Sequence, residues 1–251
     1  MSERVKEVVD TIISSIRATM IEKQVTVKEY RAGILYLHEL GLKGEIPLLS
    51  DVYFNSTAVE NENRIYKGTR SDLEGPYYLA DSPFITDEIK TLDDVEGEAM
   101  IIRGAITSVD GEPIANAELD IWHSTPDGRY SGIHDGVPQD CYRGRVITND
   151  EGRYSVKSTT PIPYEIPSQG MTGQLLQMLG NHTWRPAHIH IKTKKKGFHE
   201  LTTQAYFEGG DWTENDCCSG VCNSGVNIIA EKHEDGVRIM DIDLVLDKEV
   251  I

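Results

Sequence analysis

The sequence predicts a mainly β protein with a helical N-terminus: an antiparallel β-sandwich core that follows an α-helical region. Three observations lead to this fold class. Apolar residues recur at steps of three and four over roughly the first 60 residues, which is the helical period. From Met100 onward, short alternating segments bounded by turn residues replace that period. No helical pattern separates most of these segments, so neighbouring strands should pair antiparallel. We therefore divide the chain into a helical region, 1–97, and a sandwich, 98–251.

Three helices are expected in the first region. The first carries one apolar stripe, made of Val5, Val8, Ile12, Ile16 and Met20. Thr26 followed by Glu29 is a capping box, which predicts the start of the second helix. Pro47 suits the first turn of a third helix, because its missing N–H costs nothing there.

The strands of the second region follow one another between turn signals. Asp110-Gly111 ends the first strand, and a second turn lies at 149–152. Further strands are expected over 185–193, 201–207 and 237–246. A hairpin centred on Gly197 pairs residues whose numbers sum to about 394. That register places Gln204 opposite His190 and Tyr206 opposite His188.

Composition excludes several kinds of partner. The chain of 251 residues has 25 Lys plus Arg against 41 Asp plus Glu, a net charge of −16. Such a chain repels phosphate backbones, so no nucleic-acid partner is expected. No apolar run reaches the ~18 residues of a membrane span, and the N-terminus lacks a signal-peptide core. We therefore expect a cytoplasmic protein whose four cysteines are thiols.

His188-Ile189-His190 is the motif that most suggests chemistry. Residues i and i+2 of a strand point to one face, so the two imidazoles should lie side by side. Imidazole suits Fe, Zn, Cu or Ni. Taken alone, the pair fits a metal site and a pair of structural histidines equally well.

Other candidate side chains are less specific. Tyr130 and Tyr164 lie in turn-rich and proline-flanked segments, and from context alone each is best interpreted as a core aromatic. Cys217, Cys218 and Cys222 lack the C-x-x-C spacing of a zinc site, which favours buried or interface thiols.

Nearly the whole chain resembles the intradiol ring-cleaving catechol dioxygenases. The resemblance rests on segments that lie far apart in the sequence, namely Leu73 to Tyr78, Gly104 to Tyr130, Pro-Tyr-Glu-Ile-Pro at 163–167, Arg-Pro-Ala-His-Ile-His at 185–190 and Leu-Thr-Thr-Gln at 201–204. It implies one non-haem Fe(III) per chain, a small aromatic diol as substrate, and O2 as the second substrate. It also implies a homodimer built by the N-terminal helices, with a lipid-like molecule such as a phospholipid in a helical tunnel.

Matched position by position, the resemblance assigns the iron ligands and the catalytic residues. The four ligands are Tyr130, Tyr164, His188 and His190. Tyr164 is also the base that accepts a catechol proton when it leaves the metal. Arg185 stabilises negative charge that develops on the ring, and Gln204 orients nearby oxygen groups.

The short chain and the segment Trp122 to Gly128 most resemble the branch of the family that acts on chlorocatechols. The expected reaction is therefore the cleavage of a (chloro)catechol to a (chloro)-cis,cis-muconate. The matched pocket positions are Leu48, Asp51, Val52, Leu73, Gly75, Pro76, Tyr77, Ile102 and Cys218. The alternatives are the catechol and hydroxyquinol branches and, more distantly, a metal-free β-sandwich binding module or a zinc hydrolase that uses the two histidines and a carboxylate.

Overall fold

Two helices, α1 (Glu3–Glu22) and α2 (Val27–Leu42), form most of the first of two units into which the chain's contacts divide it, Met1–Ile46 and Pro47–Ile251. The computed structural model describes residues 2–219 and 228–249. The predicted capping box is present at the start of α2: Thr26 Oγ1 accepts from Glu29 N, and the Glu29 carboxylate accepts from Thr26 N at 2.8 Å. Two backbone N–H groups that a helix start leaves unpaired are thereby satisfied.

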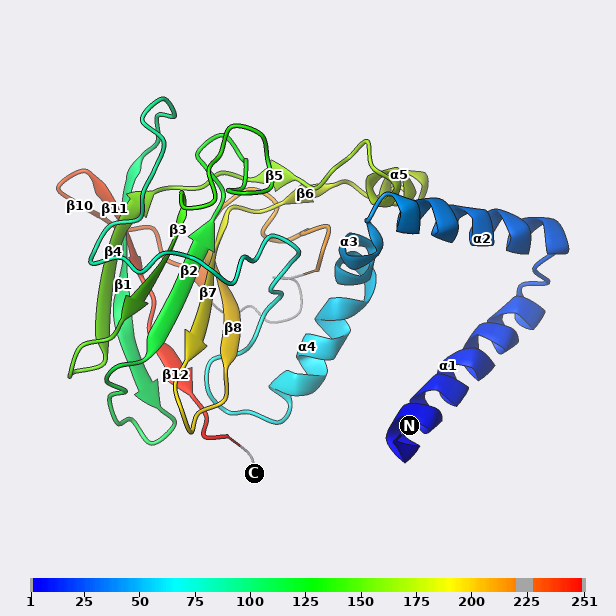
Figure 1. Ribbon diagram of the computed structural model, residues 1–251, viewed down its shortest axis with the longest axis horizontal. Coiled ribbons are helices and arrows are strands. Elements are labelled where there is room, and N and C mark those ends of the chain that lie inside the picture. The colour runs from blue at the N-terminus through cyan, green and yellow to red at the C-terminus, as the bar shows by residue number, and fades with distance from the viewer. Residues whose placement is uncertain (1, 220–227, 250–251) are drawn as a thin grey trace. The chain divides into compact units, whose positions relative to one another are not determined.

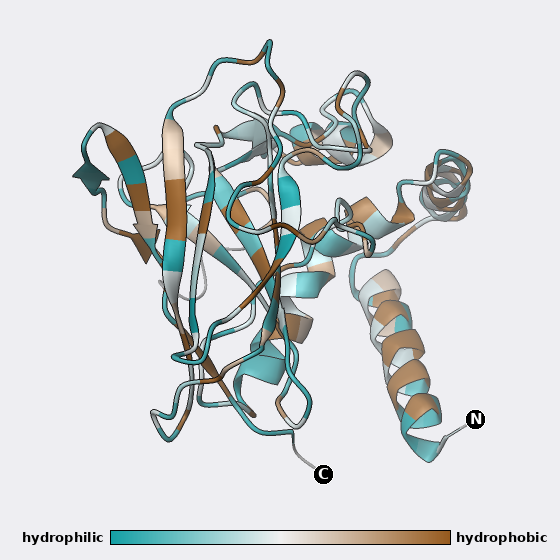
Figure 2. Cartoon of the chain, turned by 60° about the vertical axis from the view of Figure 1, so that its left-hand side comes forward, coloured by the Kyte–Doolittle hydropathy of each residue, from teal (hydrophilic) through white to brown (hydrophobic). Residues whose placement is uncertain are grey.

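The apolar stripe predicted for α1 is present and exposed. No residue of α1 is buried, and Val5, Ile12 and Ile16 are 46%, 53% and 55% exposed. In Figure 2 the helix that starts at the N-terminal end carries hydrophobic patches along its length. An exposed apolar face of this kind is typical of a surface that binds a partner.

A helical run connects the first helices to the sheets. It consists of α3 (Ile46–Ser50), a π-helical turn η1 (Asp51–Asn55) and α4 (Ser56–Asn63). Pro47 occupies the first turn, as predicted. Single π-helical turns inside a helix occur frequently at functional sites, because the wider turn re-aims the side chains it carries.

Two five-stranded sheets form the β-rich part (Figure 1). The strands of one sheet, in chain order, are β1 (Ala99–Ser108), β4 (Arg153–Thr159), β10 (His233–Glu234), β11 (Val237–Asp241) and β12 (Leu244–Leu246). Those of the other, in spatial order, are β3 (Arg143–Ile147), β2 (Glu118–His123), β7 (His188–Lys194), β8 (Leu201–Phe207) and β9 (Ile228–Ile229). A small ribbon pairs β5 (Tyr164–Glu165) with β6 (Trp184–Arg185), and α5 (Met171–Met178) lies between them in the sequence.

The sandwich is confirmed, and its pairing is mixed rather than purely antiparallel. The hairpin of β7 and β8 has the predicted register, with His190 opposite Gln204 and His188 opposite Tyr206. The pairs β1–β11, β1–β12 and β8–β9 are parallel. The two strands of each parallel pair are far apart in the sequence, and a long intervening stretch of chain lets a strand return parallel to its partner. Turn signals between neighbouring segments cannot reveal such returns.

Gly104 permits the change of partner along β1. Residues 100–103 pair with β11 and residues 106–108 with β12, and the short link between those two strands passes close to Gly104. A Cβ at this position would lie 1.9 Å from the Ile242 carbonyl oxygen. Only glycine allows so close an approach of two backbones.

The main core fills the space between the two sheets. Buried aliphatic side chains of β1, β4, β11 and β12 pack against those of β2, β7 and β8. Ile189 and Ile191 of β7 belong to this core and are 0% exposed. Because successive strand residues point to opposite faces, the histidines between and beside them lie on the other face of the sheet.

Two expectations stay open. β1 begins at Ala99, and the domain boundary predicted between residues 97 and 98 remains a prediction. Cys141, Cys217 and Cys218 are free thiols, as expected, whereas Cys222 lies outside the described residues. Within 2–219 and 228–249, no helix is both long and apolar enough to cross a membrane.

Candidate metal centre

Two histidines of the central strand β7 form the base of the site. β7 lies between β2 and β8, so its side chains are shielded on both flanks. His188 and His190 are 1% and 2% exposed. The His190 ring stacks on Trp122 of β2, with ring centroids 4.5 Å apart and planes 4° apart. The strand and its neighbours thus hold each imidazole in a fixed orientation.

The proton on His188 is fixed by the backbone. Its Nδ1 lies 2.7 Å from the Pro186 carbonyl oxygen, which can only accept a hydrogen bond. Nδ1 therefore carries the proton, and the lone pair is on Nε2. That atom lies 3.0 Å from His190 Nε2 and 3.4 Å from the Tyr130 hydroxyl oxygen. A backbone carbonyl that fixes the tautomer in this way is typical of metal-ligating histidines.

The two tyrosines reach the histidines from different parts of the chain. Tyr130 follows β2 through a tight turn, in which Gly128 has φ 85° and its N–H donates to the Thr125 carbonyl at 2.9 Å. Tyr164 is on β5 and pairs with Arg185 of β6, which leads directly into β7. The two phenol rings meet edge to face with centroids 5.2 Å apart, and their hydroxyls are hydrogen-bonded.

Burial keeps all four groups uncharged. Desolvation, with the nearby charge of Arg185, lowers the pKa of His188 to about 3. Burial and the neighbouring His188 lower the pKa of His190 well below its usual range. Burial raises the pKa of the Tyr130 and Tyr164 phenols above the usual value. Two neutral imidazoles with free lone pairs are ready to bind a cation, and a cation would supply the charge that phenolates need here.

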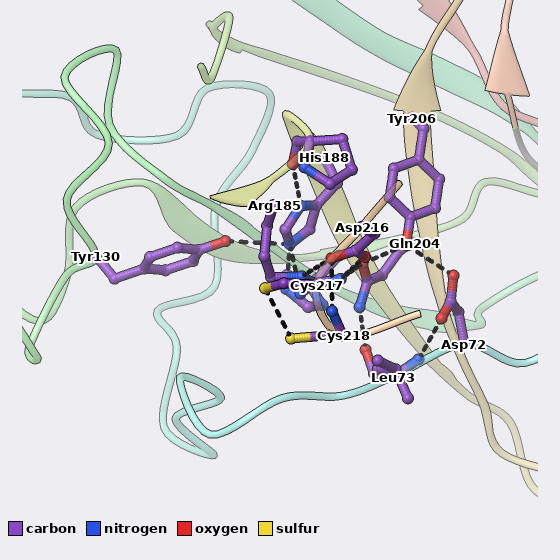
Figure 3. Close-up of polar contacts among 12 residues, drawn as sticks. Asp72, Leu73, Tyr130, Arg185, His188, Gln204, Tyr206, Asp216, Cys217 and Cys218 are labelled. Carbon is purple, nitrogen blue, oxygen red and sulfur yellow. Dashed lines mark hydrogen bonds and ion pairs between the residues drawn. The ribbon is translucent and has the colours of Figure 1, made fainter. Parts of the chain in front are cut away.

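Arg185 lies beside the imidazoles in a buried ion pair (Figure 3). Its Nε and one terminal nitrogen donate to the two Asp216 carboxylate oxygens at 3.1 and 2.8 Å. Its other terminal nitrogen lies 3.3 Å from His188 Nε2. Burial raises the pKa of the Asp216 carboxyl, but the charge of Arg185 and its hydrogen bonds outweigh burial and leave that pKa below its usual value.

A chain of hydrogen bonds extends from Arg185 across β8. Arg185 donates to Gln204 Oε1 at 3.0 Å, and Gln204 Nε2 donates to the Leu73 carbonyl. The Tyr206 hydroxyl lies 2.7 Å from Gln204 Oε1 and 2.9 Å from an Asp72 carboxylate oxygen. Burial raises the pKa of Asp72 to about 6. These contacts, drawn in Figure 3, connect the segment at 72–73 to the sheet.

The structure brings most of the predicted pocket positions to this site. Leu48 and Val52 from the helical run, together with Leu73, Tyr77 and Cys218, pack in one cluster with both tyrosines and Trp122. The Tyr77 ring lies 4.8 Å from the Tyr130 ring.

Glycine brings the segment 73–77 close to the imidazoles. A Cβ on Gly75, whose φ is +71°, would lie 3.9 Å from His190 Cε1. Asp51 and Gly75 also line a cavity of about 510 Å³, whereas Pro76 is exposed.

Ile102 alone of the predicted pocket positions is elsewhere. It is 0% exposed and belongs to the core between the two sheets. Its strand, β1, is in the sheet that does not carry the histidines. Position matching gives a place in the sequence but not the face of a strand, and Ile102 is therefore not part of the pocket that we propose below.

Several residues of the site were not predicted from the sequence. Asp216 forms the ion pair of Arg185, Trp122 supports His190, and Asp72 anchors Tyr206. A buried arginine requires a buried carboxylate. The sequence offers 41 acidic residues, however, and no spacing rule selects Asp216 among them.

Known dioxygenases are similar to both the helical and the β-rich part of this chain. Residues 2–68 match the family described as "Catechol dioxygenase N terminus", and residues 73–248 match the family described as "Dioxygenase". The chlorocatechol 1,2-dioxygenase of Pseudomonas sp. strain P51 is 47% identical over 248 residues, which cover 99% of this chain and 98% of that protein.

A catechol 1,2-dioxygenase of Acinetobacter baylyi is 33% identical over 92% of this chain and 78% of its own length. The crystal structure of a chlorocatechol 1,2-dioxygenase from Pseudomonas putida superposes with a TM-score of 0.95 at 47% identity, covering 99% of this chain and 100% of that one. The likeness therefore extends to the helices and the sandwich alike.

Proposed function

The chain belongs to the intradiol catechol dioxygenase family, and from that premise we propose that it uses one Fe(III) per chain to cleave chlorocatechols with O2. Cleavage between the two hydroxyl-bearing carbons yields a chloro-cis,cis-muconate. Family membership implies a non-haem iron, a catechol-type substrate and O2. The observation that carries the proposal is the convergence of three possible ligand atoms. His188 Nε2 lies 3.0 Å from His190 Nε2 and 3.4 Å from the Tyr130 hydroxyl oxygen.

The proposed iron ligands are His188, His190, Tyr130 and Tyr164. Two imidazole nitrogens and two phenolate oxygens match the preference of ferric iron for borderline nitrogen and hard anionic oxygen donors. When bound, the iron supplies a Lewis acid that holds the catecholate oxygens and makes the ring reactive toward O2. The positive charge also compensates for the burial that raises the pKa of both phenols.

Tyr164 is the proposed base. Burial raises the pKa of its phenol well above the usual value, so a Tyr164 phenolate without a cation beside it would readily take a proton. A catechol must lose two protons to chelate a metal. We assign one of them to Tyr164 Oη, where the edge-to-face contact with Tyr130 holds the ring in place.

We propose that Arg185 stabilises negative charge on the substrate ring and that Gln204 holds Arg185 in position. The guanidinium is buried, with 4% of its side chain exposed, so its charge acts through a medium of low dielectric constant on a negative ring. Gln204 is bonded at both ends of its amide, to Arg185 and to the Leu73 carbonyl. It therefore fixes Arg185 relative to the segment that covers His190.

The proposed pocket wall favours an apolar ring substituent. Leu48, Val52, Leu73 and Cys218 are all less than 9% exposed, and Asp51 is the only charged residue among the matched positions. A ring carboxylate would be buried there without a cationic partner, which is costly. Contact with one chlorine or methyl group contributes only ~1–3 kcal/mol, so unsubstituted catechol should be cleaved as well, within about 10- to 200-fold.

The distant alternatives find less support. A zinc hydrolase would need a carboxylate beside the two histidines, and the Asp216 carboxylate of this network is already paired with Arg185. A metal-free binding module would not explain why His188 is held in the tautomer that presents a lone pair to its neighbours. The catechol and hydroxyquinol branches share the same ligands and differ only in the pocket wall.

Reconstitution with iron tests the proposal. The expected result is about one iron per chain and a wine-red colour from phenolate-to-iron charge transfer. Tyr164→Phe should retain most of the iron, change the visible band and lower turnover of 3-chlorocatechol. Tyr142→Phe is the matched control. The Tyr142 hydroxyl lies outside the site and accepts a hydrogen bond of 3.1 Å from Leu92 N. Colourless, iron-free protein after reconstitution would reject the proposal, whereas unchanged turnover with full iron in Tyr164→Phe would remove Tyr164 from the mechanism.

We also propose that α1 forms a homodimer interface, with a phospholipid-like molecule among the helices. The support is the exposed stripe of Val5, Val8, Ile12 and Ile16. Ile12→Arg should shift the sedimentation coefficient from dimer to monomer at micromolar concentration, whereas Ser14→Arg, on another face of the helix, should not. A monomeric parent protein would contradict the dimer, and extraction without any lipid would contradict the bound molecule.

A further inference from the structure

Lys192 of β7 connects the sheet to both ends of a short segment beside the metal centre. Its Nζ donates to Glu74 Oε2 at 2.5 Å and lies 4.7 Å from the centroid of the Tyr78 ring. Nζ also lies 3.0 Å from Glu200 Oε1, just before β8. We propose that Lys192 is a positioning residue that holds residues 74–78, here called the covering segment, and thereby sets the selectivity of the pocket among ring substituents.

The covering segment lies over groups that we assign to the iron and to the ring pocket. A Cβ on Gly75 would lie 3.9 Å from His190 Cε1. The centroid of the Tyr77 ring lies 4.8 Å from that of the Tyr130 ring. A shift of this segment therefore moves part of the proposed pocket wall relative to two of the proposed ligands.

The alternation along β7 places the ammonium beside the covering segment. Lys192 follows His190 by two residues, so the two side chains point to the same face of the sheet. The Lys192 side chain is 13% exposed, and a charge so far from water needs counter-charges. The covering segment supplies one of them, Glu74, together with the Tyr78 ring, whose face attracts a cation. The charge of Lys192 and the position of the segment thus depend on each other.

Two further hydrogen bonds hold the backbone of this region. Gln204 Nε2 donates to the Leu73 carbonyl, and Arg143 donates through a terminal nitrogen to the Tyr77 carbonyl at 3.3 Å. Lys192 differs from these two, because it contacts side chains at both ends of the covering segment. Loss of the Lys192 contacts should therefore loosen the segment without detaching it, which predicts a change in selectivity rather than loss of the metal.

The two carboxylates that share this ammonium provide a matched test. Glu74→Ala removes the partner that belongs to the covering segment, and Glu200→Ala removes the partner that does not. Both carboxylates line the cavity of about 510 Å³, so a simple effect of charge should be alike in the two variants.

Limited proteolysis of the iron-loaded full chain measures how firmly the segment is held. Chymotrypsin cleavage after Tyr77 and Tyr78 should become about tenfold faster in Glu74→Ala, the scale expected for loss of one charge-assisted hydrogen bond. In Glu200→Ala the rate should stay within about twofold of the parent, because that carboxylate is a half-exposed partner outside the segment. Mass spectrometry identifies the cleaved bonds.

Selectivity is the second measurement. In Glu74→Ala and in Lys192→Met, the preference for 3-chlorocatechol over catechol in kcat/KM should fall about threefold to tenfold, with KM affected more than kcat. Iron content should stay near one per chain. Lys192→Arg keeps the charge and can contact both partners in the segment, so it should restore most of the preference.

A double variant tests whether Lys192 acts through Glu74. Because both side chains belong to one contact, Lys192→Met combined with Glu74→Ala should lose no more selectivity than the more affected single variant. Losses that simply multiply would overturn the proposed coupling. If Lys192→Met does not fold, the comparison of Glu74→Ala with Glu200→Ala decides alone.

The effect on selectivity rests on the proposed function, but the hold on the segment does not. In a chain without dioxygenase activity the cleavage rates would still decide, and equal rates in the parent and Glu74→Ala would overturn the role of Lys192. In an active enzyme, faster cleavage with unchanged selectivity would overturn the link to the pocket. Equal losses of selectivity in Glu74→Ala and Glu200→Ala would overturn it as well.

Discussion

The two faces of the sheet that contains β7 differ in what holds them together. On one face Ile189 and Ile191 pack against aliphatic side chains of the opposite sheet. On the other face His188 and His190 meet aromatic rings, and the neighbouring positions carry a buried arginine, its carboxylate partner and a glutamine. The same seven-residue strand supplies both faces, because its side chains alternate.

The two faces differ in which parts of the chain pack against them. The apolar face is covered by a second sheet, and burial of aliphatic surface stabilises it without any exact pairing of groups. The polar face is covered by segments from four remote parts of the chain, around residues 48–52, 73–77, 130 and 164. Each buried polar group there needs a particular partner, since an unpaired one is costly. Polar burial of this extent is expected at functional sites rather than in a core selected for stability.

Removal of a histidine from the polar face should have the largest effect. In His188→Ala the imidazole that is bonded to Pro186 O is lost, and no other described side chain can take its place. Loss of a supporting partner lowers metal affinity 10- to 100-fold, so loss of the ligand itself should lower iron affinity by at least about 100-fold. Metal analysis and turnover of 3-chlorocatechol measure this, and full iron with full activity would contradict the assignment.

The matching substitution on the apolar face should act on stability instead. Ile191→Ala removes a fully buried side chain from the core between the sheets and should lower the free energy of unfolding by about 2–5 kcal/mol. Iron per folded chain should stay near that of the parent. Denaturant unfolding with metal analysis on the same sample tests the comparison. If Ile191→Ala lost iron before it lost stability, the two faces would not be independent.

Changes in the proposed pocket wall should alter selectivity more than stability. Val52→Ala and a change of Tyr77 to a smaller or larger residue should shift the ratio of kcat/KM between 3-chlorocatechol, 4-chlorocatechol and catechol by ~1–3 kcal/mol at most, with iron content unchanged. Val109→Ala, at a position that is 42% exposed after β1, is a control that should keep the parent's ratios. Unchanged ratios in both pocket variants would remove these residues from the ring pocket.

The smallest expected effect is a change in pH dependence. Burial raises the pKa of Asp72 in the folded chain to about 6. Between about pH 4 and 6 the folded state therefore holds a proton that the unfolded state has lost. This contribution to stability is fully present below about pH 4 and is lost as the pH rises through about 6. Asp72→Asn cannot titrate, so its free energy of unfolding relative to the parent should rise over that interval.

Denaturant unfolding of the parent and Asp72→Asn at several pH values measures this difference. Asp216 provides the contrast within one network, because its pKa is lowered and its contribution is lost as the pH falls. A difference curve for Asp72→Asn that is flat from pH 4 to 6 would show that the Asp72 carboxyl titrates alike in the folded and unfolded chains.

The sequence by itself determined the features that depend on neighbouring residues. The capping box at Thr26 and the turn at Gly197 act over a few residues, and both predicted the helix start and the hairpin register correctly. The alternation along 188–191 likewise predicted two histidines on one face. The residue pattern of the whole chain identified the family and, through it, the proposed ligands.

Only the tertiary structure decided which distant groups meet. The ion pair of Arg185 and Asp216, the parallel pairing of β1 with β11 and β12, and the place of Ile102 in the core between the sheets all depend on segments that approach through space. No local sequence pattern predicts these contacts, because the identity of an acidic or apolar residue does not show which face of a strand it will occupy. A buried charge requires a partner, and exposed apolar surface is stabilised when other residues pack over it. Both requirements arise only when the chain folds, so folding decides which of these residues come together.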